Sequence, residues 1–440
     1  MTLSRRAVVA GLGALATGRP VGPPVPAPPA PPAPPRGVTP ERLAEDESYW
    51  GAVARRFDVE EEFLNLENGY YGVMPEPVRL AYHRNVDRLN RQNSYLLRTS
   101  YRAEADEVRR RVAEVLGAAP EEIALTRGGT EALQYLITGY NRLRPGDTVT
   151  YADLDYHSAQ YAMNWLQERR GVRVRRVTIP EPATRQAVLD TYDQALRTDP
   201  APRLLLLSHM NNRTGLVTPV RDIVAMARAR NTDVIVDAAH SFGHLDFTVD
   251  DLDADFGVFS LHKWIGAPLG SGFLHIRRHR LPDIDVAYAD ETFPRDDIRS
   301  RVHSGTMDVA PILTTGAALD FHTTLGAANK QARLRHLRDL WVTRAHAIGG
   351  IEILTPDDPA MYGAITAFRL TGRTTKADNT AVTDHLLTHH QIFTVQRGGL
   401  TGGDCVRVTP ALFTSRTDMD RLATALRDVT RRIPPLRRTR

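Results

Sequence analysis

Two stretches of the sequence decide the expected fold: Val234-Ile235-Val236-Asp237-Ala238-Ala239-His240 and Phe256-Gly257-Val258-Phe259-Ser260-Leu261-His262-Lys263-Trp264. Each begins with an apolar run typical of a buried strand and ends in polar side chains. A carboxylate such as Asp237 is costly to bury unless it is paired, and Lys263 in apolar surroundings also needs a reason. Pyridoxal phosphate would account for both, because Asp237 can pair with its ring nitrogen while the Lys263 amine forms a Schiff base. The alternative is structural, with Asp237 as a helix N-cap and Lys263 as a surface lysine.

Neighbouring polar residues suit the same cofactor. His240 could bond the phenolic oxygen of the ring, although a core histidine is the plainer interpretation. Ser260 and His262 flank the expected phosphate. The segment 126–132, Thr-Arg-Gly-Gly-Thr-Glu-Ala, joins a strand to a helix. Glycines permit close approach there and a helix start offers N–H groups to an anion, so Gly129 and Thr130 are predicted phosphate ligands; a Gly-rich turn without a ligand is the competing interpretation.

Further candidates lie elsewhere in the chain. His157 could stack on an aromatic cofactor ring, or it could be a surface histidine that opens a helix. Gly305 and Thr306 lie in an expected loop and could add phosphate contacts, including to the cofactor of a neighbouring subunit. Arg407 places a charge in the apolar run 405–409. A substrate α-carboxylate would suit a buried guanidinium, and a structural ion pair is the competitor.

The surrounding pattern predicts an α/β fold. Short apolar segments alternate with helical ones from about residue 67 to 280, which is typical of a mainly parallel sheet covered on both faces. In such sheets the ligand lies beyond the carboxyl ends of the strands, where Asp237 and Ser260 fall. The expected strands are 123–126, 148–151, 172–179, 204–208, 234–237 and 256–260, with helices at 156–170, 185–197 and 220–230. From about residue 310 a smaller α+β domain is expected, with helices at 331–347, 377–389 and 417–431 and strands at 365–370 and 406–409.

Six segments in order resemble the class V aminotransferase family, in its isopenicillin N epimerase-like branch. They are 68–72 (Asn-Gly-Tyr-Tyr-Gly), 126–132, 208–215 (Ser-His-Met-Asn-Asn-Arg-Thr-Gly), 236–243 (Val-Asp-Ala-Ala-His-Ser-Phe-Gly), 261–270 (Leu-His-Lys-Trp-Ile-Gly-Ala-Pro-Leu-Gly) and 407–410 (Arg-Val-Thr-Pro). The resemblance covers roughly residues 65 to 426. It implies fold type I of the pyridoxal phosphate enzymes, with a seven-stranded sheet in the large domain.

The resemblance also implies a homodimer with active sites at the subunit interface, and it gives each candidate a role. Cofactor contacts are implied for Gly129, Thr130, His157, Asp237, His240, Ser260, His262 and Lys263, for Gly305 and Thr306 from the partner subunit, and substrate contacts for Asn68 and Arg407. Two departures stand out. Gln134 replaces the Asn of many relatives, and His240 stands where cysteine desulfurases carry Gln. Desulfurases also need a cysteine in a mobile loop, whereas the single cysteine here, Cys405, lies in an apolar strand. Desulfurase activity is therefore not expected.

The residues leave the reaction open. Lys263 can act as general base at the substrate α-carbon, and epimerisation would need a second acid, for which Tyr70 or Tyr71 could serve. Transamination and lyase chemistry share the same first steps. A metal-dependent hydrolase built on Asp237, His240, His244, His209 and His262 is a rival hypothesis. A binding protein without turnover is another.

Composition narrows the partners and suggests a location. Residues 1–36 hold four arginines and no acid, so of the 56 basic residues 52 remain to balance the 52 acidic ones. A nucleic-acid binder would carry its excess charge on the folded body. Ser4-Arg5-Arg6 with the apolar stretch after it resembles a twin-arginine export signal, and the ten prolines between Pro20 and Pro35 predict a stiff tether. We therefore expect an exported enzyme of amino-acid or peptide-like substrates, without membrane insertion, the alternative being a cytoplasmic one.

The expected organisation has four parts. Residues 1–36 form the signal and tether, and residues 37–66 an N-terminal segment. Residues 67–309 form the large cofactor-binding domain, and residues 310–440 the small one.

Overall fold

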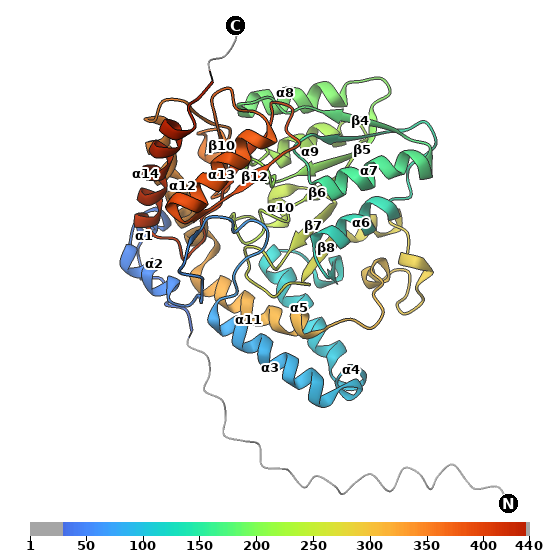
Figure 1. The fold of residues 1–440 in the computed structure, drawn as a ribbon. Helices are drawn as coiled ribbons and strands as arrows, with labels where there is room; N and C mark the ends of the chain where they lie inside the picture. Colours follow the sequence, from blue (N-terminus) through green and yellow to red (C-terminus); the bar gives the residue numbers. More distant parts are fainter. Residues whose placement is uncertain (1–29, 437–440) are drawn as a thin grey trace, which may run out of the picture.

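The computed structural model describes residues 30–436. Figure 1 shows a central sheet with helices on both sides, and a second region, in orange and red, against which the blue N-terminal helices pack. The twin-arginine segment and most of the Pro-rich tether lie outside the described residues, so the export signal stays a prediction. None of the described helices is long and apolar enough to cross a bilayer.

The larger sheet has seven strands in the order β2-β8-β7-β6-β5-β3-β4. The strands are β2 (Ile123–Thr126), β3 (Thr148–Ala152), β4 (Arg173–Val177), β5 (Pro202–Ser208), β6 (Asp233–Asp237), β7 (Phe256–Ser260) and β8 (Gly272–Ile276). Strand β8 pairs antiparallel with both of its neighbours, β2 and β7, and the other pairings are parallel. The mainly parallel seven-stranded sheet expected for fold type I is therefore confirmed, with β8 as the strand that the sequence pattern did not show.

Strand β5 shows why the sheet is apolar on both faces. Successive side chains of a strand point to opposite faces, and all four leucines from Leu204 to Leu207 are buried. Leu204 and Leu206 pack with α6 (Gly129–Gly139) and α7 (His157–Arg170). Leu205 and Leu207 pack with α8 (Arg185–Leu196) and α9 (Val220–Arg228). The helices of this part are α3 (Glu76–Gln92), α4 (Ser94–Thr99), α5 (Tyr101–Leu116), α6 (Gly129–Gly139), α7 (His157–Arg170), α8 (Arg185–Leu196), α9 (Val220–Arg228), α10 (Val249–Leu252) and α11 (Ala310–Leu325).

The smaller region has a four-stranded antiparallel sheet in the order β12-β13-β10-β9. Its elements are α12 (Ala327–His346), β9 (Ile351–Ile353), β10 (Thr366–Leu370), α13 (Lys376–His390), β11 (Ile392–Phe393), β12 (Val395–Arg397), β13 (Cys405–Val408) and α14 (Arg416–Arg432). A separate core cluster joins this sheet to its helices through Trp341, Phe368, Leu386 and Leu426. The three helices and two strands expected here from the sequence are all present.

The N-terminal segment packs on this smaller region. Helix α1 (Pro40–Ala44) contacts α12, α2 (Glu47–Ala54) follows it, and β1 (Leu64–Asn65) pairs in parallel with β11. Helix α11, which begins at the predicted boundary, packs instead on α3 and α5 of the larger region. The boundaries drawn from the sequence stay predictions. Short 3-10 turns complete the chain: η1 (Pro120–Glu122), η2 (Arg278–Asp283), η3 (Ala287–Ala289), η4 (Ile298–Arg301) and η5 (Pro359–Met361).

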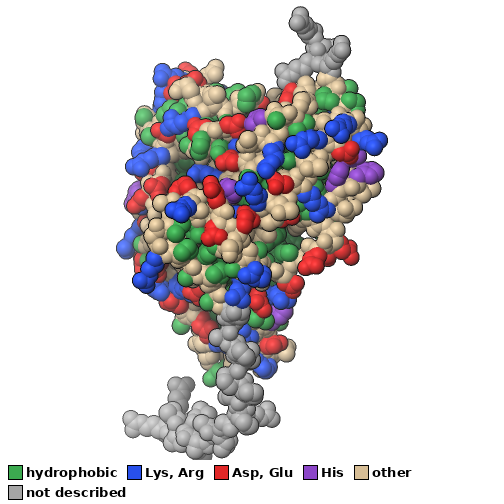
Figure 2. Space-filling model, turned by 90° about the vertical axis from the view of Figure 1, so that its left-hand side faces the viewer, with side chains coloured by type: hydrophobic (Ala, Val, Ile, Leu, Met, Phe, Trp, Pro, Cys, Tyr) green, Lys and Arg blue, Asp and Glu red, His purple; other side chains and the backbone are tan. Residues whose placement is uncertain are grey.

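The charged side chains are mixed on the face that Figure 2 shows, with acidic and basic groups interspersed. No broad single-sign field appears there, in agreement with the balanced charge of residues 37–440.

Candidate active site

A cavity of about 670 Å³ opens at the carboxyl ends of β5, β6 and β7. Eleven of the residues singled out in the sequence line it: Tyr70, Tyr71, Gly129, Thr130, His157, Asp237, His240, Ser260, His262, Lys263 and Arg407. The parallel register brings them together, because Ser208 of β5 lies beside Asp237 of β6, and Asp237 beside Val258 of β7. Strand ends that are far apart in sequence thus meet at one edge of the sheet.

Three candidates lie elsewhere. Gly305 and Thr306 line a separate cavity of about 440 Å³ near α5. Asn68 is buried, and its amide donates to the carbonyls of Asn65 (3.0 Å) and Thr409 (2.9 Å). It lines a small pocket on the other side of the Lys263 segment. The functions predicted for these three residues therefore stay predictions.

Lys263 follows β7 by three residues, and its Nζ lies 2.8 Å from His240 Nε2. Burial lowers the pKa of Lys263 from 10.5 to about 8, while the Asp237 carboxylate opposes that shift. Burial, and then the charge of Lys263, holds the pKa of His240 well below its usual range. His240 is therefore a neutral acceptor for the lysine, and an appreciable fraction of Lys263 is an unprotonated nucleophile near neutral pH.

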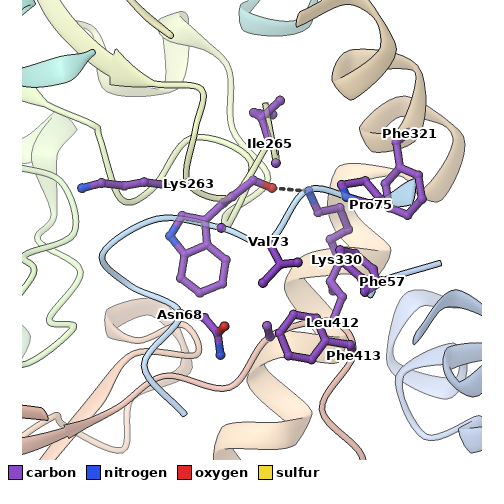
Figure 3. A pocket seen from close by; sticks show the side chains of 14 residues that line it. Phe57, Asn68, Val73, Pro75, Lys263, Ile265, Phe321, Lys330, Leu412 and Phe413 are labelled. Atoms are coloured by element: carbon purple, nitrogen blue, oxygen red, sulfur yellow. Dashed lines mark hydrogen bonds between the residues drawn. The ribbon is translucent and has the colours of Figure 1, made fainter. Parts of the chain in front are cut away.

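A second buried lysine, Lys330, must be distinguished from Lys263. The full sequence has three lysines, Lys263, Lys330 and Lys376. Lys330 Nζ donates to the carbonyl of Trp264 (2.8 Å) and lies 2.9 Å from His322 Nδ1. Figure 3 shows Lys330 inside the small pocket, with the Lys263 amine pointing away from that pocket's apolar side chains. Lys263 is thus the lysine of the large cavity, whereas Lys330 hydrogen-bonds to the backbone at Trp264, the residue after Lys263.

The surroundings of Asp237 suit a buried carboxylate that pairs with a cationic ligand. The backbone N–H of Ala239 donates to its Oδ1 (3.0 Å), and burial raises its pKa above the usual value. Asp155 lies nearby, accepts from the N–H groups of Ala152 (2.6 Å) and Ser208 (3.0 Å), and has its pKa raised to about 7, mainly by burial. A protonated ring nitrogen over Asp237 would offset the cost of burying its charge. The carboxylate thus fits the ring of pyridoxal phosphate.

The N-terminus of α6 forms the matching anion site. No side chain caps this helix. Its first residue, Gly129, donates through N–H to Ser260 Oγ (3.3 Å), and a Cβ at Gly129 would lie only 2.7 Å from that oxygen. His262 Nδ1 lies 3.0 Å from the carbonyl of Ser271, so Nδ1 carries the proton and Nε2 is left for a ligand. The helix N-terminus, the hydroxyls of Ser260 and Thr130, and the imidazole of His262 fit a phosphate here.

Arg407 already has a carboxylate partner. It is fully buried in β13, and its guanidinium pairs with Glu67 and donates to the carbonyl of Asn212 (2.5 Å). Glu67 Oε1 also accepts from Arg397 Nη2 at 3.1 Å. Arg397, which the sequence analysis did not single out, lines the cavity too. The structural ion pair that competed with this role is therefore present, between Arg407 and Glu67. Docking of a substrate carboxylate by Arg407 stays a prediction.

The loop with Tyr70 and Tyr71 is fixed to the Lys263 segment. The N–H of Gly72 donates to the carbonyl of His262 (2.8 Å), and a Cβ at Gly72 would lie 2.0 Å from the carbonyl oxygen of Lys263. The glycine is therefore required for this contact. Both tyrosine rings are exposed at the cavity.

The hydrolase hypothesis has no matching metal site. Among residues 30–436, Asp237 and the histidines 209, 240, 244 and 262 form no group of three ligand atoms within 4.8 Å of one another. His244 Nε2 instead accepts from the N–H of Ala364 (2.7 Å). Cys405 is buried in β13, and burial raises the pKa of its thiol to about 12. It lacks the mobility and the ionisation that a desulfurase nucleophile needs.

Comparisons with known proteins agree with this geometry. A family model described as aminotransferase class-V matches residues 79–416. An isopenicillin N epimerase of Amycolatopsis lactamdurans is 29% identical over 407 residues, which are 87% of this chain and 99% of the relative. A cysteine desulfurase of Pectobacterium atrosepticum is 29% identical over 376 residues, 80% of this chain and 86% of the relative.

Solved structures show the same fold. The cysteine desulfurase CsdA of Escherichia coli superposes with a TM-score of 0.73 at 22% identity, covering 87% of this chain and 98% of its own. A mutant of the lyase C-DES with glycine covalently linked to pyridoxal phosphate has a TM-score of 0.72 at 20% identity, covering 83% and 96%.

Proposed function

We propose that this chain, which belongs to the class V aminotransferase family, transfers a proton at the α-carbon of an amino-acid group carried by a peptide-like substrate. The family and the cofactor, pyridoxal phosphate, were both expected from the sequence and are confirmed. When bound, pyridoxal phosphate withdraws electrons from the substrate α-carbon and makes its hydrogen acidic. The proposal goes beyond the family in choosing an epimerase-like reaction.

The observation that carries the proposal is the pairing of Lys263 with His240 in the cavity. A pKa of about 8 leaves Lys263 able both to accept and to return a proton near neutral pH. His240 Nε2, at 2.8 Å, holds the amine in position without competing for its proton, since its own pKa is far lower. Lys263 therefore serves as the base on one side of the substrate.

Inversion needs a proton donor on the other side. Tyr70 and Tyr71 are the candidates, because both line the cavity and their loop is fixed to the Lys263 segment through Gly72. A desulfurase would need a thiol instead, and Cys405 is buried and un-ionised. These features favour an epimerase-like reaction over desulfuration, in line with the name of the relative from Amycolatopsis lactamdurans.

The substrate and the location of the enzyme are also part of the proposal. Tyr70 and Leu269 are 73% and 57% exposed at the cavity, so a bulky group beyond the α-carbon has room. A peptide-like metabolite fits this opening. The twin-arginine pattern at Arg5 and Arg6 supports action after export of the folded protein.

A homodimer is also proposed. Gly305 and Thr306 lie outside the cavity of their own chain, and nothing lies within 4 Å of a Cβ built at Gly305. The space at Gly305 is therefore open, and the proposal places this loop at the phosphate site of a second copy. Light scattering should give twice the chain mass of 48.9 kDa, and a monomer that is fully active would contradict this arrangement.

The first experiment locates the cofactor. The purified holoenzyme is reduced with borohydride, digested and mapped, and we expect the pyridoxyl group on Lys263 alone among the three lysines. Label on Lys330, or none at all, would refute the assignment. Lys263→Ala should abolish the label.

The second experiment identifies the reaction. Amino acids and peptide-like substrates are incubated in heavy water, and α-hydrogen exchange, inversion, keto-acid formation and ammonia release are followed separately. We expect exchange with inversion. Tyr70→Phe or Tyr71→Phe should suppress inversion more than exchange, because Lys263 still serves one face. The control is Tyr161→Phe, an exposed tyrosine of a neighbouring pocket that does not line the cavity. Keto acid or ammonia without inversion would refute the epimerase-like reaction.

A further inference from the structure

Two histidines and an aspartate converge in the smaller region, away from the cavity. His385 and His390 lie on α13, and Asp428 lies on the neighbouring helix α14. His385 Nε2 is 2.8 Å and His390 Nε2 is 3.1 Å from the same oxygen, Asp428 Oδ2. The ligand atoms of all three side chains lie within 4.8 Å of one another, which no other group of His, Cys, Asp and Glu achieves in the described part of the chain.

The two helices hold this cluster in place. Helices α13 and α14 contact each other, and Leu386 on α13 and Leu426 on α14 share a buried core. Arg421 of α14 donates to the carbonyl of His390 and so anchors the last residue of α13. The three side chains are partly buried, with exposures of 13% for His385, 24% for His390 and 35% for Asp428. Their positions thus depend on core packing as well as on their own contacts.

The donor set is the one that a late transition metal prefers. Two imidazole nitrogens and one carboxylate oxygen suit Zn²⁺, whereas Mg²⁺ and Ca²⁺ prefer oxygen alone. Ligands at about 2.1 Å from a tetrahedral ion lie about 3.4 Å apart. The present separations of 2.8 and 3.1 Å need to widen by about 0.6 and 0.3 Å to reach that spacing.

We propose that His385, His390 and Asp428 form a binding site for a divalent transition-metal ion, with Zn²⁺ as the reference ion, that links α13 to α14. Arg432 Nε lies 3.7 Å from the other oxygen, Asp428 Oδ1, and leaves Oδ2 to the metal. Three protein ligands leave a fourth position for water. The ion bridges two helices of the smaller region, so its effect is on the stability of that region. It has no part in the chemistry at Lys263.

The test uses the holoenzyme without a histidine tag, stripped with a chelator and desalted. Calorimetric titration with Zn²⁺ and elemental analysis after gel filtration should both give one ion per chain. His390→Gln and Asp428→Asn, which remove ligands from different helices, should each weaken binding at least about tenfold, the effect expected even for an outer partner of a ligand. Zn²⁺ should raise the unfolding temperature of the wild type and not that of these variants. Mg²⁺ should neither bind nor compete.

The matched control is His346→Gln. His346 makes a similar surface pair, with Nε2 at 2.9 Å from Asp357, but belongs to no three-ligand group among residues 30–436. Its removal should leave Zn²⁺ binding unchanged. Circular dichroism and the cofactor absorbance show whether each variant is folded. Because the two ligand variants lie on separate helices, one still tests the proposal if the other does not fold. A wild type that binds no Zn²⁺ in the micromolar range, or variants that bind as tightly as the wild type, would overturn the proposal.

Discussion

The lowered pKa of Lys263 can be measured directly and supports the proposed base. Burial lowers this pKa from 10.5 to about 8, which corresponds to about 3 kcal/mol in favour of the neutral amine. The unprotonated fraction near neutral pH is then about 300-fold larger than for an ordinary lysine. Below a pH of about 8, Lys263 is charged in the folded protein, and burying that charge lowers the free energy of unfolding by the full amount. This loss of stability disappears as the pH rises from about 8 to 10.5, because the unfolded chain binds more protons than the folded protein in that range.

The perturbation is Asp237→Asn. The Asp237 carboxylate raises the pKa of Lys263 against the effect of burial, so its removal should move the midpoint further below 8. Competitive acylation of the cofactor-free protein between about pH 6 and pH 11, read peptide by peptide in the mass spectrometer, gives the midpoint for Lys263. The exposed Lys376 in the same digest calibrates the reagent. A wild-type midpoint near 10, or a midpoint that rises in Asp237→Asn, would refute the reasoning.

Three shorter predictions test the surroundings of the site. Gly129→Ala should weaken retention of the cofactor about tenfold or more, because the new Cβ would lie 2.7 Å from the Ser260 hydroxyl oxygen at the expected phosphate site. Dialysis followed by an absorbance measurement gives the cofactor retained. Gly349→Ala, where a Cβ meets nothing within 4 Å, should leave retention unchanged. Glu67→Gln deprives two guanidinium groups of their shared carboxylate, so we expect the free energy of unfolding in urea to fall by about 3–5 kcal/mol. Asp222→Asn, in an exposed pair, should cost less than about 1 kcal/mol, and equal losses in the two variants would contradict this view of Glu67. Cys405→Ala should keep kcat close to that of the wild type, because the thiol is buried and un-ionised, whereas loss of turnover in a folded variant would revive a thiol mechanism.

The elements that sequence predicted best are those with continuous burial. Strands β2 and β7 have the expected bounds. Turns or helices flank each strand, and most of the side chains in both strands are buried. Strand β8 was missed, since Gly272 and His275 interrupt its apolar pattern and it runs against its neighbours. His275 is nonetheless buried, 3.6 Å from Glu122, in a contact that only the folded sheet brings about.

The site divides in the same way. Asp237, Ser260 and Lys263 were predictable because each ends or follows a strand of one parallel sheet, and the edge of that sheet is common to all of them. The partner of Arg407 was not, because Glu67 is 340 residues away and approaches from another segment. Arg397 was overlooked because it lies in a three-residue strand before a diglycine turn, where an exposed charge is the ordinary expectation.

The choice of reaction therefore depends on a contact that sequence reasoning could not supply. In the proposed reaction, proton removal uses Lys263, and its position is set locally because it follows β7 by three residues. Inversion needs a second donor at a fixed distance across the substrate, and a flexible loop could not provide it reliably. Gly72 removes that flexibility, because its N–H bonds to His262 and no larger residue fits against the carbonyl of Lys263. Tyr70 and Tyr71 are thus held to the segment that carries Lys263, and this contact would keep the proposed donor and the proposed base in a fixed relation.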